Sequence, residues 1–168
     1  MGKVHIIGIS RNQDSQRKLG LCVFPVDNVN EIEVIQGKGI IGDRYFLENN
    51  EKRKQITLIE IENIDIYNKI SQTNIPAIKF RRNIVTEGIK LNDLIGKEFF
   101  IGKVKVKAHD LCRPCKYLQE SLKQKNIIKE FLHKGGLRCE ILSSGKIFIG
   151  DIIVVWSIIL KLPLNGFL

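Results

Sequence analysis

Cys112 and Cys115 are three positions apart and are the residues whose type and spacing most directly suggest chemistry. They lie in AHDLCRPCKYLQE (108–120), where a strand-like pattern gives way to a helix-like one. A Cys-x-x-Cys pair can form half of a zinc site, a dithiol redox couple, or a place where one thiolate reacts alone. Two small cysteines packed at a strand end are the simplest alternative.

A structural zinc site would need two further ligands, and Cys139 and His133 are the candidates. Their spacing is unfavourable, because the chain has no second Cys-x-x-Cys and no His pair at zinc-finger spacing. A redox pair has a better local setting, since helix amides and the flanking Arg113 and Lys116 favour a thiolate. A thioredoxin-like fold would need a βαβ unit here, whereas the preceding residues predict a β-meander.

The composition describes a folded globular protein, with 43% hydrophobic and 27% charged residues over 168 positions. This length predicts one domain spanning residues 1–168. An excess of 27 Lys and Arg over 18 Asp and Glu gives a net charge of +9, which suits an anionic partner. A basic module that binds nucleic acid or a phosphorylated ligand is therefore a non-enzymatic alternative, although aromatic and basic residues do not interleave as in a stacking platform.

The sequence shows neither a signal-peptide pattern nor an apolar run long enough for a membrane span. The expected location is the cytoplasm, without a membrane partner. In that compartment the cysteines are expected to be reduced thiols and not structural disulfides.

Short apolar and β-branched runs dominate the chain and predict strands. The predicted strands are KVHIIGIS (3–10), GLCVFPV (20–26), ITLIE (56–60) and FRRNIVTEGI (80–89), and EIEVIQGKGIIGD (31–43) alternates before a turn at its three glycines. Alternating residues around a Gly102-Lys103 turn predict a hairpin that leads to Cys112, and two more strands flank Ser143–Gly145.

Helical patterns are few. A helix is predicted over about 60–70, with Ile64, Tyr67 and Ile70 on its apolar side, and two more over 115–124 and 126–136. The last of these is expected to end at a Gly135-Gly136 cap. The predicted fold class is mainly β, a closed or strongly curved β-barrel with a few short helical insertions.

Three ordered stretches together resemble the MOSC domain, the family named after the C-terminal region of molybdenum cofactor sulfurase. They are GIIGDRYFLENNEKRKQITLIE (39–60), KFRRNIVTEGIKLNDLIGKEFFIG (79–102), and DLCRPCKYLQE through HKGGLRCEILSSGKIFIGD (110–151). Together they cover most of residues 37–155. The resemblance implies a β-barrel, in agreement with the strand pattern.

The same resemblance implies a ligand, the pterin-based molybdenum cofactor (molybdopterin), and a role for one cysteine. The characteristic cysteine of the family falls on Cys115, where it would ligate molybdenum or carry a sulfur atom. A thiolate suits both tasks, because molybdenum held by a dithiolene is a soft-ligand centre. Cys112 would then be a supporting or resolving thiol, or simply a packed cysteine.

The phosphate or nucleotide tail of such a cofactor needs cationic and amide donors. Strand alternation in FRRNIV predicts that Arg81 and Asn83 share one face as an anion-binding pair and that Arg82 points to the other face. An ordinary salt bridge is the alternative for Arg81. Asp43 and Arg44 follow three glycines and are predicted polar contacts, unless Asp43 only caps a tight turn.

Two residues beside the cysteine pair are further candidates, Arg113 and His109. Arg113, between the two cysteines, is a further cofactor-binding candidate. His109 precedes the pair and could tune its thiolate, whereas His133 is more simply a helix cap.

Two activities fit the resemblance. One is molybdenum-dependent reduction of N-hydroxylated substrates with electrons from a separate protein. The other is sulfur or cofactor handling for another molybdoenzyme. The chain shows no desulfurase, iron-sulfur or flavin segment and ends soon after GDIIVVW, which favours handling. The apolar end SIILKLPLNGFL (157–168) is expected to pack on the barrel or on a second subunit in a homodimer.

Overall fold

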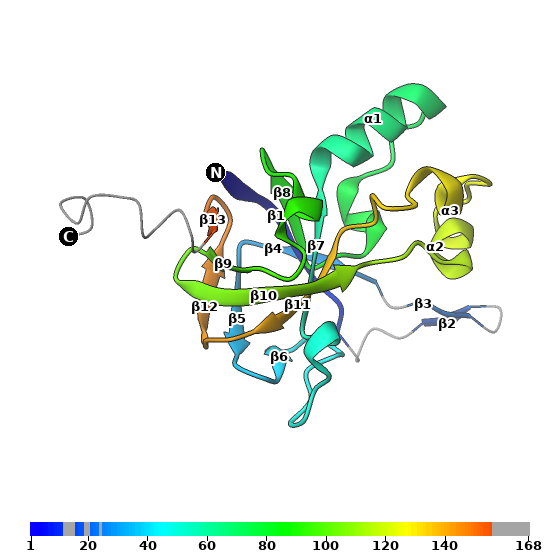
Figure 1. Cartoon of the computed structure of the whole chain (residues 1–168). Helices are drawn as coiled ribbons and strands as arrows, with labels where there is room; N and C mark the ends of the chain where they lie inside the picture. The colour runs from blue at the N-terminus through cyan, green and yellow to red at the C-terminus, as the bar shows by residue number, and fades with distance from the viewer. Residues whose placement is uncertain (12–15, 19–20, 24, 156–168) are drawn as a thin grey trace.

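A ring of hydrogen-bonded strands encloses the main core of the molecule (Figure 1). The computed structural model describes residues 1–11, 16–18, 21–23 and 25–155. The ring strands are β1 (Gly2–Ile9), β7 (Ile56–Glu60), β8 (Ile84–Glu87), β9 (Glu98–Ile101), β10 (Val104–Leu111), β11 (Leu137–Ile141) and β13 (Ile152–Val155). They pair in the order β13-β9-β10-β11-β7-β8-β1, and pairing of β1 with β13 closes the ring. The predicted mainly β barrel is therefore confirmed.

Shorter strands and helical segments decorate this barrel. The strands are β2 (Gln16–Lys18), β3 (Leu21–Val23), β4 (Asp27–Val29), β5 (Glu31–Ile35), β6 (Gly39–Ile40) and β12 (Gly145–Phe148). The α-helices are α1 (Ile61–Ser71), α2 (Lys116–Ser121) and α3 (Ile127–Glu130), and the 3-10 helices are η2 (Lys52–Lys54), η3 (Ala77–Phe80) and η4 (Leu91–Leu94). The three α-helices gather on one side of the barrel, away from β13 (Figure 1).

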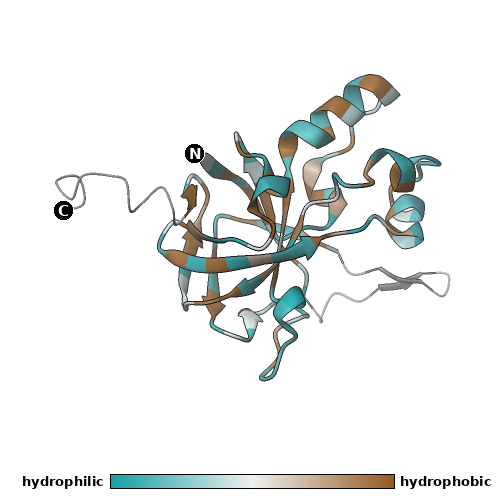
Figure 2. Ribbon diagram, in the orientation of Figure 1, coloured by the Kyte–Doolittle hydropathy of each residue, from teal (hydrophilic) through white to brown (hydrophobic). Residues whose placement is uncertain are grey.

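Two apolar clusters follow from the alternation of side chains along the strands. Leu58 and Ile84 point into the barrel, whereas their neighbours Ile59 and Val85 point outward and are buried under the helices. The outer cluster contains Phe80 and Phe131, whose ring centroids lie 4.8 Å apart. Burial on both faces explains why ITLIE reads as a continuous apolar run, whereas β10 alternates brown and teal in Figure 2.

The connection from β7 through α1 to β8 differs from a simple meander. Leu58 pairs with Ile84 in a parallel register, and α1 is the crossover between the two strands. Ile64 and Tyr67 are buried on α1 as predicted, but Ile70 is 73% exposed, so its predicted place on the apolar side was wrong. Ile70 is in the last turn of α1 and extends past the surface that the helix covers.

Gly135 and Gly136 do not cap a helix, because α3 already ends at Glu130. A Cβ added to Gly135 would overlap the carbonyl oxygen of Cys112, and one on Gly136 would overlap that of Leu58. The backbone of this segment therefore passes directly between the end of β10 and β7. The Gly-Gly pair is needed for this close approach, and the predicted cap was a wrong interpretation of it.

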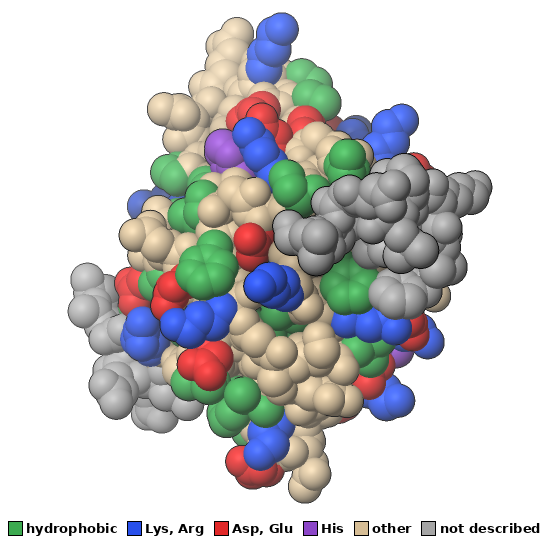
Figure 3. Space-filling view, turned by 90° about the vertical axis from the view of Figure 1, so that its left-hand side faces the viewer, with side chains coloured by type: hydrophobic (Ala, Val, Ile, Leu, Met, Phe, Trp, Pro, Cys, Tyr) green, Lys and Arg blue, Asp and Glu red, His purple; other side chains and the backbone are tan. Residues whose placement is uncertain are grey.

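The barrel surface opposite the helices carries charges of both signs. Figure 3 shows Lys and Arg interspersed with Asp and Glu and with single hydrophobic side chains on this face. Phe148, Ile149 and Ile152, in and between β12 and β13, are 43% to 48% exposed. The apolar end of the chain, predicted to pack on the barrel or a second subunit, lies in 156–168, outside the described residues.

Gly136→Ala is expected to destabilise the protein by about 3 kcal/mol or more, because a forced backbone shift adds to the strain of a positive φ. Gly150→Ala is the matched control. Gly150 has φ 89 against 93 for Gly136, but no described heavy atom lies within 4 Å of a Cβ added there. The control should cost only about 1–2 kcal/mol. Urea unfolding measures both, and equal losses would show that close approach is unimportant.

Candidate functional site

One cavity of about 310 Å³ brings together Cys115 and the six residues predicted to bind the cofactor, which are Asp43, Arg44, Arg81, Asn83, Cys112 and Arg113. It is lined by Ser10, Val26, Asp43, Arg44, Tyr45, Arg53, Lys54, Thr57, Arg81, Arg82, Asn83, Cys112, Arg113, Cys115, Tyr117, Leu118 and Arg138. These residues come from the end of β1, the residue before β4, the loop before β7 and β7 itself, the segment before β8, the segment from the end of β10 to the start of α2, and β11. Seven lining residues are Arg or Lys and one is an acid. The cavity wall is therefore strongly positive.

Asp43 organises the loop that carries Arg44 and Tyr45 into this wall. Its carboxylate is buried and accepts the backbone N–H of Ser10 at 2.9 Å and of Tyr45 at 3.0 Å. The Arg44 backbone N–H in turn donates to the Ser10 carbonyl at 2.7 Å. Asp43 thus fastens the loop to the end of β1, and its geometry is that of a turn-forming aspartate.

Arg44 and Tyr45 form a paired surface in the cavity. The Arg44 guanidinium lies 4.4 Å from the Tyr45 ring centroid, and its Nη2 donates to Tyr45 Oη at 2.8 Å. A guanidinium against an aromatic ring keeps its charge while its orientation is fixed. The loop therefore presents a positive charge of defined position.

Residues 81–83 are not part of a strand, so the alternation argument for them was wrong. The strand β8 starts at Ile84, and Arg81 follows η3 with φ 62 in the left-handed region. As a result Arg81, Arg82 and Asn83 all line the cavity, and Arg82 does not point to an opposite face. A 3-10 turn that ends in a left-handed residue, which sequence alternation does not reveal, causes the difference.

Arg81 and Arg82 occupy different environments. Burial lowers the pKa of Arg81, and the nearby positive charges of Arg44 and Arg82 act in the same direction. The Arg81 guanidinium also lies 5.6 Å from the Tyr117 ring centroid. Arg82 instead donates from Nε to the Gly135 carbonyl at 3.0 Å and from Nη1 to the Phe80 carbonyl at 3.2 Å. Arg82 therefore ties backbone segments together, whereas Arg81 contributes charge to the cavity.

Asn83 joins three strands of the barrel. Its Oδ1 accepts both the backbone N–H and the hydroxyl of Thr57 at 3.0 Å, and its Nδ2 donates to the Gly8 carbonyl at 3.4 Å. The backbone N–H of Asn83 also donates to the Thr57 hydroxyl at 3.1 Å. These bonds connect the segment before β8 with β7 and β1, so the side chain has a clear structural role.

The two cysteines are strongly asymmetric. Cys112 is only 4% exposed, and burial raises the pKa of its thiol against the opposing effect of Arg82 and Arg138. Cys115 is exposed at the N-cap position of α2 and lines the same cavity. Cys115 is thus the thiol of the pair that a ligand in the cavity can reach.

Several cavity residues were missed by the sequence analysis, foremost Arg53, Lys54 and Arg138. Arg53 and Lys54 lie in the charged stretch ENNEKRKQ, which predicts only a surface loop. Arg138 is the polar neighbour of Cys139 in β11, and strand alternation alone gives it no special role. Only the position of Arg138 in the barrel, beside the end of β10, identifies it as a site residue, and that position depends on the pairing of β10 with β11.

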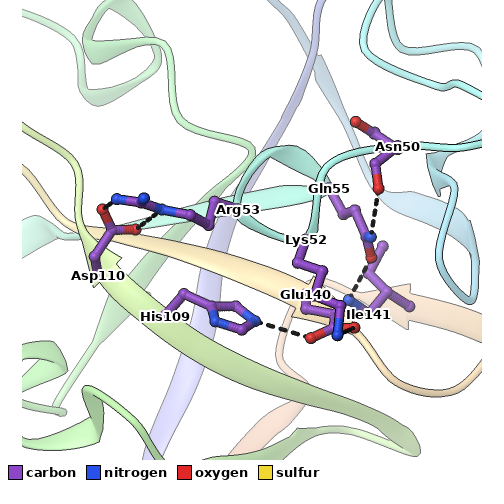
Figure 4. A network of polar contacts seen from close by, with 8 residues as sticks. All are labelled: Asn50, Lys52, Arg53, Gln55, His109, Asp110, Glu140 and Ile141. Atoms are coloured by element: carbon purple, nitrogen blue, oxygen red, sulfur yellow. Dashed lines mark hydrogen bonds and ion pairs between the residues drawn. The ribbon is translucent and has the colours of Figure 1, made fainter.

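The remaining candidate residues lie outside the cavity. His109 Nε2 contacts Glu140 Oε2 at 2.8 Å beside Lys52, as Figure 4 shows, and is not among the lining residues. Cys139 is fully buried in the barrel core. His133 adopts φ 66 in the turn after α3, and its carbonyl accepts the Asn92 amide. His109 therefore does not approach the pair as a direct neighbour in the site.

Cys139 and His133 do not join Cys112 and Cys115 as ligands. Within the described ranges, no group of three or more His, Cys, Asp or Glu is arranged to hold a metal ion. In the same part of the chain, no helix is long and apolar enough to cross a membrane.

Fold and site together define a β-barrel protein with a cationic cavity that contains one exposed cysteine. The model of the MOSC domain family matches residues 38–154, so the chain belongs to this family. A comparison with curated protein sequences gives no match.

Solved structures show the same fold at low sequence identity. The YuaD protein from Bacillus subtilis superposes with a TM-score of 0.72 at 18% identity, over 92% of this chain and 96% of that one. YiiM from Geobacillus stearothermophilus gives 0.71 at 17% identity, over 92% and 75%. YiiM from Escherichia coli gives 0.63 at 15% identity, over 91% and 69%. The barrel is therefore shared across most of the chain.

Asn83→Ala is expected to destabilise the protein by about 2–3 kcal/mol, because it leaves the Thr57 N–H without its acceptor and unlinks three strands. Asn92→Ala is the control, since the exposed Asn92 side chain donates one bond to the His133 carbonyl. That change should cost less than about 1 kcal/mol. Thermal or urea unfolding measures the difference, and similar losses would contradict the bridging role of Asn83.

Proposed function

We propose that the cavity binds the pterin-based molybdenum cofactor and that the Cys115 thiolate is its protein ligand for molybdenum or its acceptor for sulfur. The observation that carries the proposal is the joint placement of one exposed cysteine and seven cationic side chains in a single cavity. Membership of the MOSC family, which is associated with this cofactor, supports it.

The residues of the cavity fit the chemical groups of this cofactor. A phosphate ester needs positive charge and hydrogen-bond donors, which Arg44, Arg81 and Arg113 would provide. A dithiolene-bound molybdenum favours a soft ligand, and Cys115 is the reachable thiol. The volume of about 310 Å³ lies at the lower end of the range of small-molecule sites.

The other predicted residues would act by holding the site in shape. Asp43 keeps Arg44 and Tyr45 in the wall, and Asn83 holds the strands beneath it. Cys112 would support the segment from its buried position, where a raised pKa keeps the thiol protonated near neutral pH. Cys115 would have to remain reduced, which the cytoplasm allows.

When bound, molybdenum would supply either oxygen-atom removal from a substrate or a place to carry transferable sulfur. In the first case the protein reduces N-hydroxylated compounds with electrons from a separate donor protein. In the second it passes sulfur or cofactor to another molybdoenzyme. The exposed position of Cys115 is compatible with both, since either route requires access from solvent or from a partner.

Cofactor retention tests the proposal directly. The protein would be produced without oxygen in a host that makes the cofactor, and molybdenum and pterin would be measured per chain. Wild type should retain both, Cys115→Ser should lose most of the molybdenum, and Arg81→Gln should lose both. Cys112→Ala is the matched cysteine control and should retain both, because its thiol is buried.

Failure of this experiment has two distinguishable forms. A wild-type protein that retains neither molybdenum nor pterin argues against cofactor binding altogether. Equal molybdenum in wild type and Cys115→Ser removes Cys115 from the metal site while leaving the cavity assignment open to the Arg81→Gln result.

An activity assay separates the two candidate activities. With an artificial electron donor and a hydroxylamine substrate, the loaded protein should show turnover that depends on Cys115 if it is a reductase. A sulfur or cofactor carrier should show no turnover but should transfer its cargo to a cofactor-free molybdoenzyme. Turnover in the Cys115→Ser variant at the wild-type rate would contradict the role of this residue.

A further inference from the structure

Two aromatic side chains stand among the cations of the cavity wall. Tyr45 belongs to the loop that Asp43 fastens to β1, and Tyr117 lies in the first turn of α2, two residues after Cys115. Of the described residues that line the cavity, these two are the aromatic ones. Cations and amide groups are sufficient to bind a phosphate, so the two rings indicate that the cavity also recognises another chemical group.

Tyr45 is held in place and still presents ring surface. The Arg44 guanidinium lies over the ring, 4.4 Å from its centroid, and Arg44 Nη2 donates to the Tyr45 hydroxyl at 2.8 Å. These two contacts fix the orientation of the ring. Tyr45 is nevertheless 48% exposed, so a ligand in the cavity can contact the ring that Arg44 orients.

Tyr117 lies close to the second guanidinium of this part of the cavity. It is half-buried, and its ring centroid is 5.6 Å from the Arg81 guanidinium. Burial lowers the pKa of Arg81, and Tyr117 and Tyr45 both oppose this effect. The two tyrosines therefore lie near the same guanidinium, although they come from different segments of the chain. Two aromatic rings and two planar cations gather in one part of the wall.

Planar side chains of these kinds bind flat heteroaromatic rings. Nucleic-acid bases stack on tyrosine faces and on arginine guanidinium planes, and such stacking depends little on the identity of the base. Loss of one stacking contact weakens binding by roughly fivefold to a hundredfold. The pterin of the proposed cofactor is a flat heteroaromatic ring of the same general type.

We propose that Tyr45 and Tyr117 form a ring subsite, which binds the heteroaromatic ring of the ligand separately from its phosphate and its metal. The inference rests on the proposed function, because it divides the same ligand between two parts of one cavity. The tyrosines bind the pterin ring, and the cations bind the phosphate. Since stacking requires neither charge nor metal, the cavity binds a free pterin that lacks both phosphate and molybdenum.

Two probes test this division, pterin without a phosphate and ribose 5-phosphate without an aromatic ring. Pterin binding would be followed by its fluorescence and ribose 5-phosphate binding by calorimetry, at neutral pH. Wild type should bind both. Tyr45→Leu and Tyr117→Leu should each weaken pterin binding about fivefold or more and leave ribose 5-phosphate binding within about twofold of wild type. Tyr45→Phe and Tyr117→Phe keep the ring and should bind pterin within about twofold of wild type.

Three further variants serve as controls. Phe148→Leu removes a ring that is 43% exposed, close to the exposure of Tyr45, but lies outside the cavity lining, so pterin binding should not change. Arg81→Gln should weaken ribose 5-phosphate binding about tenfold, because it removes a charge that binds the phosphate. Cys115→Ser should bind pterin as wild type does, since stacking requires no thiol.

Three results would overturn the ring subsite. Equal losses of pterin binding in the Phe and Leu variants would show that the hydroxyl groups make the contact and the rings do not. Equal losses of pterin and ribose 5-phosphate binding in the Leu variants would show that the tyrosines only position the arginines. A wild-type protein that binds no pterin would also refute the subsite.

Cofactor retention separates this inference from the proposed function. If the Tyr45→Leu, Tyr117→Leu double variant retains as much molybdenum cofactor as wild type, the ring subsite is wrong and the proposed function stands. If wild type binds pterin through the two tyrosines but retains no molybdenum when produced with the cofactor, the ring subsite stands and the proposed function is wrong. If wild type binds neither pterin nor cofactor, both are wrong.

Discussion

The site depends on a backbone crossing that only residues without side chains can make. Gly135 and Gly136 pass between the carbonyl of Cys112 and that of Leu58, with no space for a Cβ at either position. The Cys112 backbone N–H donates to the Gly136 carbonyl at 2.7 Å, and Arg82 donates to the Gly135 carbonyl at 3.0 Å. One crossing thus connects β7, the end of β10, the segment before β8 and the start of β11. These are the segments whose side chains form most of the cavity wall.

The barrel supplies the stability that a positively charged cavity requires. Like charges at short range destabilise a folded protein, and burial lowers the pKa of Arg81 beside Arg44 and Arg82. The apolar cluster inside the barrel and the one under the helices offset this repulsion without contributing to the wall. Ion pairs of Arg53 with Asp110 and of Lys54 with Glu51 offset part of it locally, and Arg82 is further stabilised by hydrogen bonds to backbone carbonyls. A stable barrel tolerates this concentration of positive charge, and the charge itself does not contribute to folding.

The sequence predicts the barrel well because its strands carry their own signals. Alternation in β10 and the Gly102-Lys103 turn locate the hairpin, and Val104 pairs with Ile101 as that turn requires. Helix lengths were harder, since α3 is only four residues and its apparent continuation to Gly136 is a set of turns. The strand prediction for residues 81–83 failed for a related reason, because Arg81, in the left-handed region, interrupts the alternation of side chains along a strand.

The site was only partly predictable, for reasons of distance along the chain. Resemblance to a family brought Cys115, Arg81 and Arg44 to attention, and all three lie in the cavity. Arg53 and Arg138 carry no local pattern, since their relation to the cysteines exists only once η2 and β11 pack against β10. Long-range pairing is what a single sequence specifies least directly. The structure therefore identifies the charged side chains that complete the cavity wall, whereas the sequence alone does not.

The asymmetry of Cys112 and Cys115 follows from the same crossing. The backbone of Cys112 is fixed against Gly135 and Gly136, so its side chain is buried at the strand end. Three residues later the chain has left that anchor and begins α2, which places Cys115 at the exposed N-cap. Backbone contacts at Cys112 therefore help to set the position of the reachable thiol. A fold that anchors Cys112 and presents Cys115 thus keeps one thiol accessible at the cavity.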